Sequence, residues 1–340
     1  MIDLISDTVT KPSPKMLQAM FDATVGDDVF GEDPGINELE AYAAEMFAME
    51  NALFCPSGTM TNQIAIKVHT NPGDEVICDA TSHIYNYEGG GISVNSGVQA
   101  RLIQGDRGRI NPKQIEEVIN AEFDWLTRSK LVSIENTANK AGGSFYSLNQ
   151  MQELSDFVKS KNLSFHMDGA RFFNAATEAH YEAKQVGPLF DSISICLSKG
   201  LGAPVGSLLL GNKAFIKEAR RIRKRMGGGM RQAGFLAAAG LYALKNNITR
   251  LKEDHSKAKA IAIELEKCAY AKEILPVETN IVIFELNRDS YTATDFTNLL
   301  LSKGIRVSPF GGNSIRMVTH LDFSDNMLEN AIRILKSLNK

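Results

Sequence analysis

The chain contains the stretch Ser192-Ile193-Ser194-Ile195-Cys196-Leu197-Ser198-Lys199-Gly200, an apolar run followed closely by a lysine. The apolar run predicts a buried strand over 192–197. A lysine at the end of a buried strand is unusual, because an ammonium group is rarely buried without a partner. Two readings of Lys199 remain open: an amine placed to form a Schiff base, or a lysine whose long side chain reaches solvent.

Similar short apolar runs precede this stretch and alternate with amphipathic segments of helical length. The predicted strands cover residues 75–79, 130–135, 163–168 and 192–197, and the predicted helices include 60–69 before the first of them and 148–161 between the second and third. Strands that alternate with helices in this way indicate an α/β domain with a largely parallel sheet. In such a domain we expect the active site at the carboxyl ends of the strands.

The last third of the chain has a different pattern. Long helical segments, 215–225 and 232–267 with a break near 246, are followed by a shorter mixture of strands and helices. The length of 340 residues also exceeds the roughly 250–300 residues that a single core usually supports. We therefore predict two domains: an N-terminal segment with a large domain over 1–246, and a small α+β domain over 247–340.

The composition excludes several classes of protein. Lys+Arg total 37 against 40 Asp+Glu, a net charge of -3, which favours neither nucleic acid nor an anionic membrane as a partner. The segment Ala233–Leu244 is too short to span a bilayer, and the first residues do not resemble a secretory signal. The four cysteines are scattered without a paired motif, as is typical of a reducing compartment. We expect a cytoplasmic protein.

Three further sites carry residues suited to chemistry. Asp168 ends a predicted strand one helix before Lys199, so it could face the pyridine nitrogen of a cofactor, or simply pair with Arg171. Gly58-Thr59 opens a predicted helix, where backbone N–H groups bind phosphate or a hydroxyl serves as an ordinary cap. His83 follows another strand and could stack on a cofactor or move a proton, or be structural.

Other motifs give weaker indications. Gly200–Gly206 superficially resembles a dinucleotide fingerprint, but its spacing is wrong and a strand rather than a helix follows it. No group of His, Cys and carboxylate residues has zinc-like spacing, so we predict no metal. The basic run over 217–225 is most simply a solvated helix face, with a phosphate or nucleic acid as alternative ligands.

Taken together, these segments resemble the low-specificity L-threonine aldolases, fold-type I pyridoxal phosphate enzymes of the β-eliminating lyase and threonine aldolase family. The resemblance spans nearly the whole chain in the family's order. The matching blocks are Asp3–Thr10, Val25–Pro34, Pro56–Thr59, Glu135–Thr137, His166–Arg171, Leu197–Gly202, Gly227–Gln232 and Arg316–His320. The resemblance implies a large pyridoxal phosphate-binding α/β domain with a small α+β domain, arranged as a homotetramer built from two dimers with active sites at the dimer interface.

The resemblance also implies roles for individual residues. The positions that would hold pyridoxal phosphate are Gly58, Thr59, His83, Asp168, Arg171, Lys199, Lys224 and Arg231. Lys199 would attach the cofactor, Asp168 would keep its ring nitrogen protonated, and His83 would stack on the ring. Arg171 would approach the ring oxygen, while Gly58 and Thr59 hold the phosphate. Lys224 and Arg231 would reach that phosphate from a neighbouring subunit.

The implied reaction is cleavage of L-threonine, L-allo-threonine and related β-hydroxy-α-amino acids to glycine and an aldehyde. Ser6, Arg171 and Arg316 would bind the substrate carboxylate, and we expect His83 to be the base that accepts the β-hydroxyl proton. The alternatives within the same fold are a β-eliminating lyase and an amino-acid racemase. An alternative of another class is a non-catalytic protein that binds a partner through its basic helix.

Three residues depart from the family's pattern. Ala138 stands where many members have His, Phe30 where many have Tyr, and Trp125 where some have a His near the substrate. We expect the chemistry at Lys199 to survive these changes. The preference between threo and allo substrates, and the range of side chains accepted, depends on them.

Overall fold

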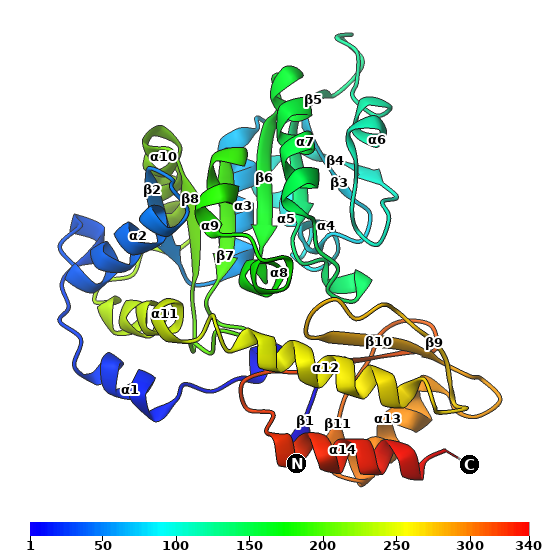
Figure 1. Ribbon diagram of the computed structural model, residues 1–340. Helices are drawn as coiled ribbons and strands as arrows, with labels where there is room; N and C mark the ends of the chain where they lie inside the picture. The colour runs from blue at the N-terminus through cyan, green and yellow to red at the C-terminus, as the bar shows by residue number, and fades with distance from the viewer. Residues whose placement is uncertain (340) are drawn as a thin grey trace.

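A seven-stranded sheet with helices on both faces forms the centre of the molecule (Figure 1). The computed structural model describes residues 1–339. The strand order is β2-β8-β7-β6-β5-β3-β4, and β8 runs opposite to its neighbours β2 and β7 while the other pairs are parallel. The strands are β2 (Asn51–Cys55), β3 (Asp74–Asp79), β4 (Gln99–Ile103), β5 (Arg128–Glu135), β6 (Ser164–Gly169), β7 (Ser192–Cys196) and β8 (Ser207–Gly211). The predicted α/β class with a largely parallel sheet is confirmed.

Helices cover the sheet because its strands are apolar on both faces. One face packs against α2 (Pro34–Met46), α7 (Leu148–Ser160), α8 (Phe172–Ala179), α9 (Ala183–Val186) and α11 (Gly234–Asn246), with α1 (Pro14–Phe21) and α6 (Pro112–Glu116) at its margins. The other face packs against α3 (Gly58–His69), α4 (His83–Asn86), α5 (Gly91–Ser96) and α10 (Lys213–Arg225). Alternate residues of a strand point to opposite faces, so Leu208 and Leu210 join the first core while Leu209 joins the second.

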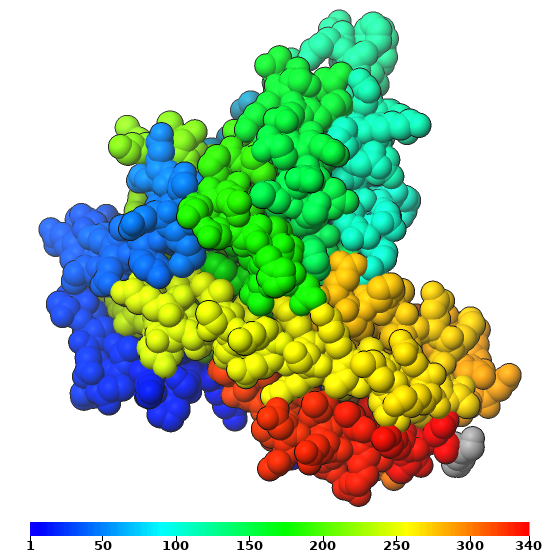
Figure 2. Space-filling view, viewed as in Figure 1, coloured from blue at the N-terminus to red at the C-terminus, as the bar shows by residue number. Residues whose placement is uncertain are grey.

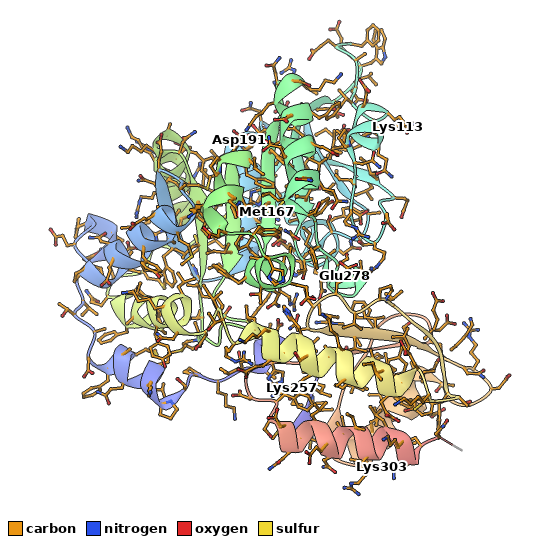
Figure 3. All side chains as sticks on the ribbon, in the orientation of Figure 1. Lys113, Met167, Asp191, Lys257, Glu278 and Lys303 are labelled. Carbon is orange, nitrogen blue, oxygen red and sulfur yellow. The ribbon has the colours of Figure 1, made fainter. Side chains whose placement is uncertain are left out.

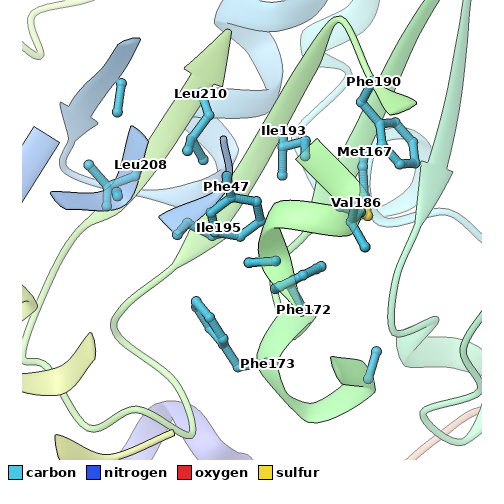
Figure 4. Close-up of a cluster of buried hydrophobic side chains, with 14 of the residues drawn as sticks. Phe47, Met167, Phe172, Phe173, Val186, Phe190, Ile193, Ile195, Leu208 and Leu210 are labelled. Carbon is cyan, nitrogen blue, oxygen red and sulfur yellow. The ribbon is translucent and has the colours of Figure 1, made fainter. Parts of the chain in front are cut away.

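The larger of these cores packs against β7, the strand that leads to Lys199. Ile193 and Ile195 of β7 point toward α8, where Phe172 meets Phe47 at a ring-centroid distance of 4.8 Å (Figure 4). The side chains of all four residues are almost completely buried. A rigid β7 fixes the position of the chain that follows it, including Lys199.

The small domain has its own core. Its antiparallel sheet has the order β12-β13-β10-β9, and β11 forms a separate pair with β1. The strands are β1 (Ile2–Asp3), β9 (Ala271–Ile274), β10 (Ile281–Leu286), β11 (Ile305–Arg306), β12 (Ser308–Pro309) and β13 (Ser314–Val318), and the helices are α12 (Leu251–Leu265), α13 (Ala293–Ser302) and α14 (Asp325–Ser337). The mixture of antiparallel strands and helices is the α+β arrangement expected for this part of the chain.

The first residues of the chain belong with this second core, which corrects the predicted grouping of the N-terminal segment with the large domain. β1 pairs in parallel with β11, and Ile2 and Leu4 are buried among small-domain side chains. A two-residue strand gives too little pattern to predict a partner 300 residues away. The division of the chain at residue 246 itself stays a prediction.

The two domains meet along α12, which lies between them in the space-filling view (Figure 2) and contacts α8 of the large domain as well as β10 and α14 of the small one. Glu278 lies in the same junction (Figure 3), where it pairs with Arg107 and accepts the Phe145 N–H at 3.2 Å. These contacts fix the small domain against the edge of the large sheet where the parallel strands end. Within residues 1–339, no helix is both long and apolar enough to cross a membrane.

Candidate active site

A cavity of about 480 Å³ lies at the carboxyl ends of the parallel strands. It brings together five of the predicted site residues, Ser6, His83, Arg171, Lys199 and Arg316. The remaining lining residues are Thr8, Tyr87, Asn139, Lys140, Ser308, Pro309, Phe310 and Gly311. The N-terminal segment, the large domain and the small domain all contribute, so the cavity exists only when the two domains are docked.

Lys199 and Asp168 reach this region from neighbouring strands. β6 and β7 pair in parallel, with Asp168 opposite Ser194, and Lys199 follows three residues after the end of β7. Lys199 is half-buried and lines the cavity. Of the two readings left open by the sequence, the structure favours the amine that faces a binding site.

Gly58 and Thr59 begin α3 beside the end of β7. A side chain at Gly58 would place its Cβ 2.6 Å from the Cys196 Sγ, so only glycine allows α3 to start this close to the sheet. The Ser57 hydroxyl caps the helix by accepting the Met60 N–H at 3.2 Å. The first N–H groups of a helix have no partner within it, which leaves those of Gly58 and Thr59 available to an anion.

Asp168 is a buried carboxylate with both oxygens engaged. Oδ1 accepts the Ala170 N–H at 3.1 Å, and Oδ2 accepts from the Asn62 amide at 2.9 Å. The neighbouring carboxylate of Glu135 ends β5 in register with Asp168. Burial, together with the charge of Asp168, raises the pKa of Glu135 to about 7.

His83 is held from two sides at the start of α4. Its backbone N–H donates to Glu135 Oε2 at 2.9 Å, and its Nδ1 lies 3.0 Å from Glu88 Oε1. Burial alone would lower the pKa of His83, but the hydrogen bond with Glu88 and the charges of Asp168 and Glu135 raise it above its usual value of 6.5.

Two arginines face the cavity in different states. Arg171 makes a bidentate ion pair with the buried Asp7, with distances of 2.8 Å from Nε and 2.7 Å from Nη2. Within residues 1–339, the side chain of Arg316 makes no hydrogen bond or ion pair, and its Nε is buried without a partner. Burial, and then the charge of Arg171, lowers the pKa of Arg316 to about 10, so the group is still a cation at neutral pH. The Arg316 guanidinium is therefore a cation without a counter-charge of its own at the cavity.

Lys224 and Arg231 lie elsewhere on the chain. Both are exposed, and neither lines the cavity that contains Lys199. Lys224 borders a separate basic cavity of about 380 Å³, and Arg231 pairs with Asp27 at 2.8 Å. Their predicted contact with a phosphate on a neighbouring subunit stays a prediction.

The comparisons with known proteins agree with this geometry. A family model described as Beta-eliminating lyase matches residues 3–289. The chain belongs to the β-eliminating lyase family. The low specificity L-threonine aldolase of Escherichia coli (strain K12) is 42% identical over 329 residues, which cover 96% of each chain. The probable low-specificity L-threonine aldolase 2 of Arabidopsis thaliana is 41% identical and covers 95% of this chain and 93% of its own length.

Solved structures show the same fold within the family. Threonine aldolase from Leishmania major superposes with a TM-score of 0.87 at 21% identity, over 100% of both chains. A putative L-allo-threonine aldolase from Listeria monocytogenes gives a TM-score of 0.81 at 20% identity, over 99% of this chain and 96% of its own. The resemblance and the fold type predicted from the sequence motifs are confirmed.

The side chains of this β-eliminating lyase family member fit pyridoxal phosphate. The open start of α3 suits a phosphate, the buried Asp168 carboxylate suits a protonated ring nitrogen, and the Lys199 amine suits an aldehyde. The unpartnered Nε of Arg316 lies at the same cavity and suits the carboxylate of an amino acid. Each charged or reactive group of the cofactor and of an amino acid thus has a protein group of opposite charge or complementary reactivity.

The sequence did not single out several residues that the structure places at the site. They are Asp7, Asn62, Tyr87, Glu88, Glu135 and Phe310. Asp7 and Glu135 lie inside the motifs that carry the family resemblance, so the sequence could have indicated them as site residues. Asn62 and Glu88 lie in segments without such a signal, and only their burial and contacts reveal them.

The three departures from the family's pattern lie outside the cavity lining of this chain. Ala138 is buried against Gly108. If Gly108 carried a side chain, its Cβ would lie only 2.7 Å from the Ala138 Cβ, so the two residues are in close contact. Phe30 is 72% exposed beneath the Arg231 guanidinium, and Trp125 is 76% exposed and stacks on Phe123 at 4.7 Å. Neither Phe30 nor Trp125 therefore contacts the cavity of its own chain.

Proposed function

We propose that this protein is a pyridoxal phosphate-dependent aldehyde lyase that cleaves L-threonine, L-allo-threonine and related β-hydroxy-α-amino acids to glycine and an aldehyde. The observation that carries the proposal is the unpaired Arg316 guanidinium in the same cavity as the Lys199 amine. A site with both groups suits an amino acid on pyridoxal phosphate. The names of the relatives at 41–42% identity supply the reaction.

Different residues of the chain would bind different parts of the cofactor. Lys199 would attach it, Asp168 would face its ring nitrogen, and Gly58 and Thr59 would hold its phosphate at the start of α3. When bound, pyridoxal phosphate withdraws electrons from a bond to the Cα of the amino acid. The side chains around the cavity select which bond that is by fixing the orientation of the amino acid.

The substrate carboxylate would lie against Arg316, with the Ser6 hydroxyl beside it. Arg171 lines the same cavity, but two of its guanidinium nitrogens are occupied by Asp7. We therefore assign the larger share of carboxylate binding to Arg316. A carboxylate held there fixes one end of the amino acid and leaves the Cα–Cβ bond to be oriented by the rest of the cavity.

We expect Arg316→Leu to raise the KM for L-threonine, because the variant loses a charge-assisted hydrogen bond of about 1.5–3 kcal/mol, or about 10- to 150-fold. Steady-state kinetics measures this change. The control is Arg306→Leu, which removes an exposed arginine of the same domain that pairs with Asp3. The KM should stay close to the wild-type value in the control, and an unchanged KM in Arg316→Leu contradicts the assignment.

We propose that His83 accepts the β-hydroxyl proton, directly or through a water molecule. A base must be unprotonated, so activity should be lost as pH falls through the pKa of His83, which lies above 6.5. In Glu88→Gln the hydrogen bond to a carboxylate is lost, and the inflection in kcat/KM against pH should move to lower pH. An inflection at the same pH in both proteins would show that another group titrates.

We also propose a homotetramer built from two dimers, with Lys224 and Arg231 completing the phosphate site of a neighbouring subunit. Both side chains are exposed and lie outside the cavity of their own chain, which supports a role in another copy. The four cysteines are buried thiols, in keeping with our proposal of a cytoplasmic protein.

The proposed function is tested by the absorbance spectrum and the products formed from L-threonine. We expect an absorbance band beyond the aromatic region after pyridoxal phosphate is added, and acetaldehyde with glycine as products. Ammonia with a 2-keto acid would indicate β-elimination, and D-allo-threonine would indicate racemisation at Cα. A protein that stays colourless with added cofactor would favour the non-catalytic alternative.

A further inference from the structure

The side chain of Asn62 connects two carboxylates close to the His83 ring, those of Glu88 and Asp168. It extends from the second turn of α3, is almost completely buried, and donates from Nδ2 to Glu88 Oε1 and to Asp168 Oδ2, both at 2.9 Å. One nitrogen or oxygen atom from each of His83, Glu88 and Asp168 lies within 4.8 Å of the others. Two carboxylates this close repel each other unless a donor lies between them. The Asn62 amide is such a donor.

The orientation of this amide is fixed. Carboxylates only accept hydrogen bonds, so the amide nitrogen must face Glu88 and Asp168 and the amide oxygen must face His166. The Asn62 Oδ1 lies 3.1 Å from His166 Nε2, which must therefore carry the proton. Burial lowers the pKa of His166 to about 3, so the ring is neutral and has a single N–H. A flipped Asn62 would place its amide oxygen against two carboxylate oxygens and its amide nitrogen against the N–H of His166.

The next partners of His166 fix its tautomer. Its Nδ1 has no proton and accepts from the Ser192 hydroxyl at 2.8 Å. The Ser192 oxygen in turn lies 2.8 Å from the Nε2 of His69, whose pKa burial lowers to about 4. The hydrogen bonds therefore run in one direction, from His69 through Ser192 and His166 to Asn62. The chain ends where the two N–H groups of Asn62 donate to the carboxylates of Glu88 and Asp168.

We propose that Asn62 is a positioning residue, which holds the Asp168 carboxylate toward the ring nitrogen of pyridoxal phosphate and holds Glu88 against His83. The inference rests on the proposed function in one respect, that pyridoxal phosphate binds in this cavity. It does not depend on which bond of the amino acid is broken. Asn62 needs no contact with substrate or cofactor to act in this way.

A buried asparagine also stabilises a fold, so the test needs a matched control. Asn313 is buried in the small domain, and its amide donates to the carbonyls of Leu286 and Tyr291 at 3.0 and 3.1 Å. Its oxygen accepts the Ala293 N–H at 2.8 Å. Asn313 thus donates two hydrogen bonds and accepts one, as Asn62 does, but it donates to backbone carbonyls and not to carboxylates of the site.

The variant Asn62→Asp keeps the size of the side chain and replaces both donors by an acceptor. The probes are pyridoxal phosphate and its deaza analogue, in which C–H replaces the ring nitrogen, each titrated into the apoprotein. We expect the Kd of pyridoxal phosphate to rise at least about tenfold, because a charge-assisted hydrogen bond to the ring nitrogen is weakened. The Kd of the deaza analogue should change by less than about threefold, because that ligand never makes this hydrogen bond.

In the control Asn313→Asp, both dissociation constants should stay within about twofold of wild type, even if the protein unfolds at a lower temperature. In Asn62→Ala, a water molecule can enter and donate to the carboxylates, so the rise for pyridoxal phosphate should be smaller than in Asn62→Asp. If Asn62→Asp does not fold, the Kd of pyridoxal phosphate is compared with that of the deaza analogue in Asn62→Ala instead.

Two results would overturn the proposal: an unchanged Kd for pyridoxal phosphate in the Asn62 variants, or an equal rise for both ligands. An equal rise would mean that the cavity has collapsed and that Asn62 has only a structural role. If the wild-type protein binds pyridoxal phosphate but does not cleave threonine, the proposed function is wrong. The role of Asn62 can still be tested by the two dissociation constants in that case.

Discussion

Lys199→Ala should abolish threonine cleavage, with a fall in kcat of at least roughly 10⁴-fold, the scale of losing a group that bonds covalently in the reaction. The amine lines the cavity three residues after β7, and neither β7 nor the two residues that join it to Lys199 include another lysine. The absorbance band of the lysine-linked cofactor should also be lost. Absorbance titration with pyridoxal phosphate and steady-state kinetics measure the two effects.

The matched control is Lys140→Ala, which removes another lysine that lines the same cavity. Lys140 lies 5.7 Å from the centre of the Tyr87 ring and is not at a strand end. This variant should keep both the absorbance band and most of the activity. Activity that survives in Lys199→Ala, or a band that is lost equally in both variants, contradicts the assignment of Lys199.

Asp7→Asn should destabilise the protein by ~3–5 kcal/mol, because it leaves the buried Arg171 guanidinium without its counter-charge. Both side chains are buried and joined by two hydrogen bonds, so water cannot replace the missing carboxylate. Urea unfolding followed by circular dichroism measures the change. The double variant Asp7→Leu with Arg171→Leu should lose less stability than the sum of the single changes, since it leaves no unpaired charge.

The same ion pair predicts how stability responds to acid. Burial alone would raise the pKa of Asp7, but the charge and hydrogen bonds of Arg171 outweigh burial and hold it well below its usual value of 3.8. The folded state therefore binds the proton less tightly than the unfolded state. The resulting stabilisation is fully present above pH 3.8 and is lost as pH falls below that value. Asp7→Asn should lack this part of the acid dependence, and an unchanged urea midpoint would contradict the prediction.

Much of the fold could be predicted because apolar runs mark buried strands. The predicted strands over 75–79 and 192–197 agree with β3 and β7 to within one residue. As expected, Asp168 lies on β6 and Lys199 follows the neighbouring strand β7. The parallel pairing of β1 with β11 could not be predicted, because two residues carry no periodicity. It is this pairing that places Ser6 and Asp7 beside the site.

The inner support of the site could not be predicted for a different reason. Asn62 and Glu88 are polar residues whose importance depends on burial between α3, α4 and the sheet. A polar residue within a predicted helix is most simply read as exposed, and no local pattern distinguishes the exceptions. The motifs therefore identified the groups expected to react, while the structure identified the groups that hold them.

The most direct test uses L-threonine labelled with ¹³C at both Cα and Cβ, followed by NMR in the presence of the holoprotein. Cleavage of the Cα–Cβ bond should remove the coupling between the two labels and give glycine labelled at Cα and acetaldehyde labelled at its carbonyl carbon, in equal amounts. If the labelled threonine is consumed but the two labels stay coupled in a 2-keto acid or an epimer of threonine, the proposed reaction is wrong.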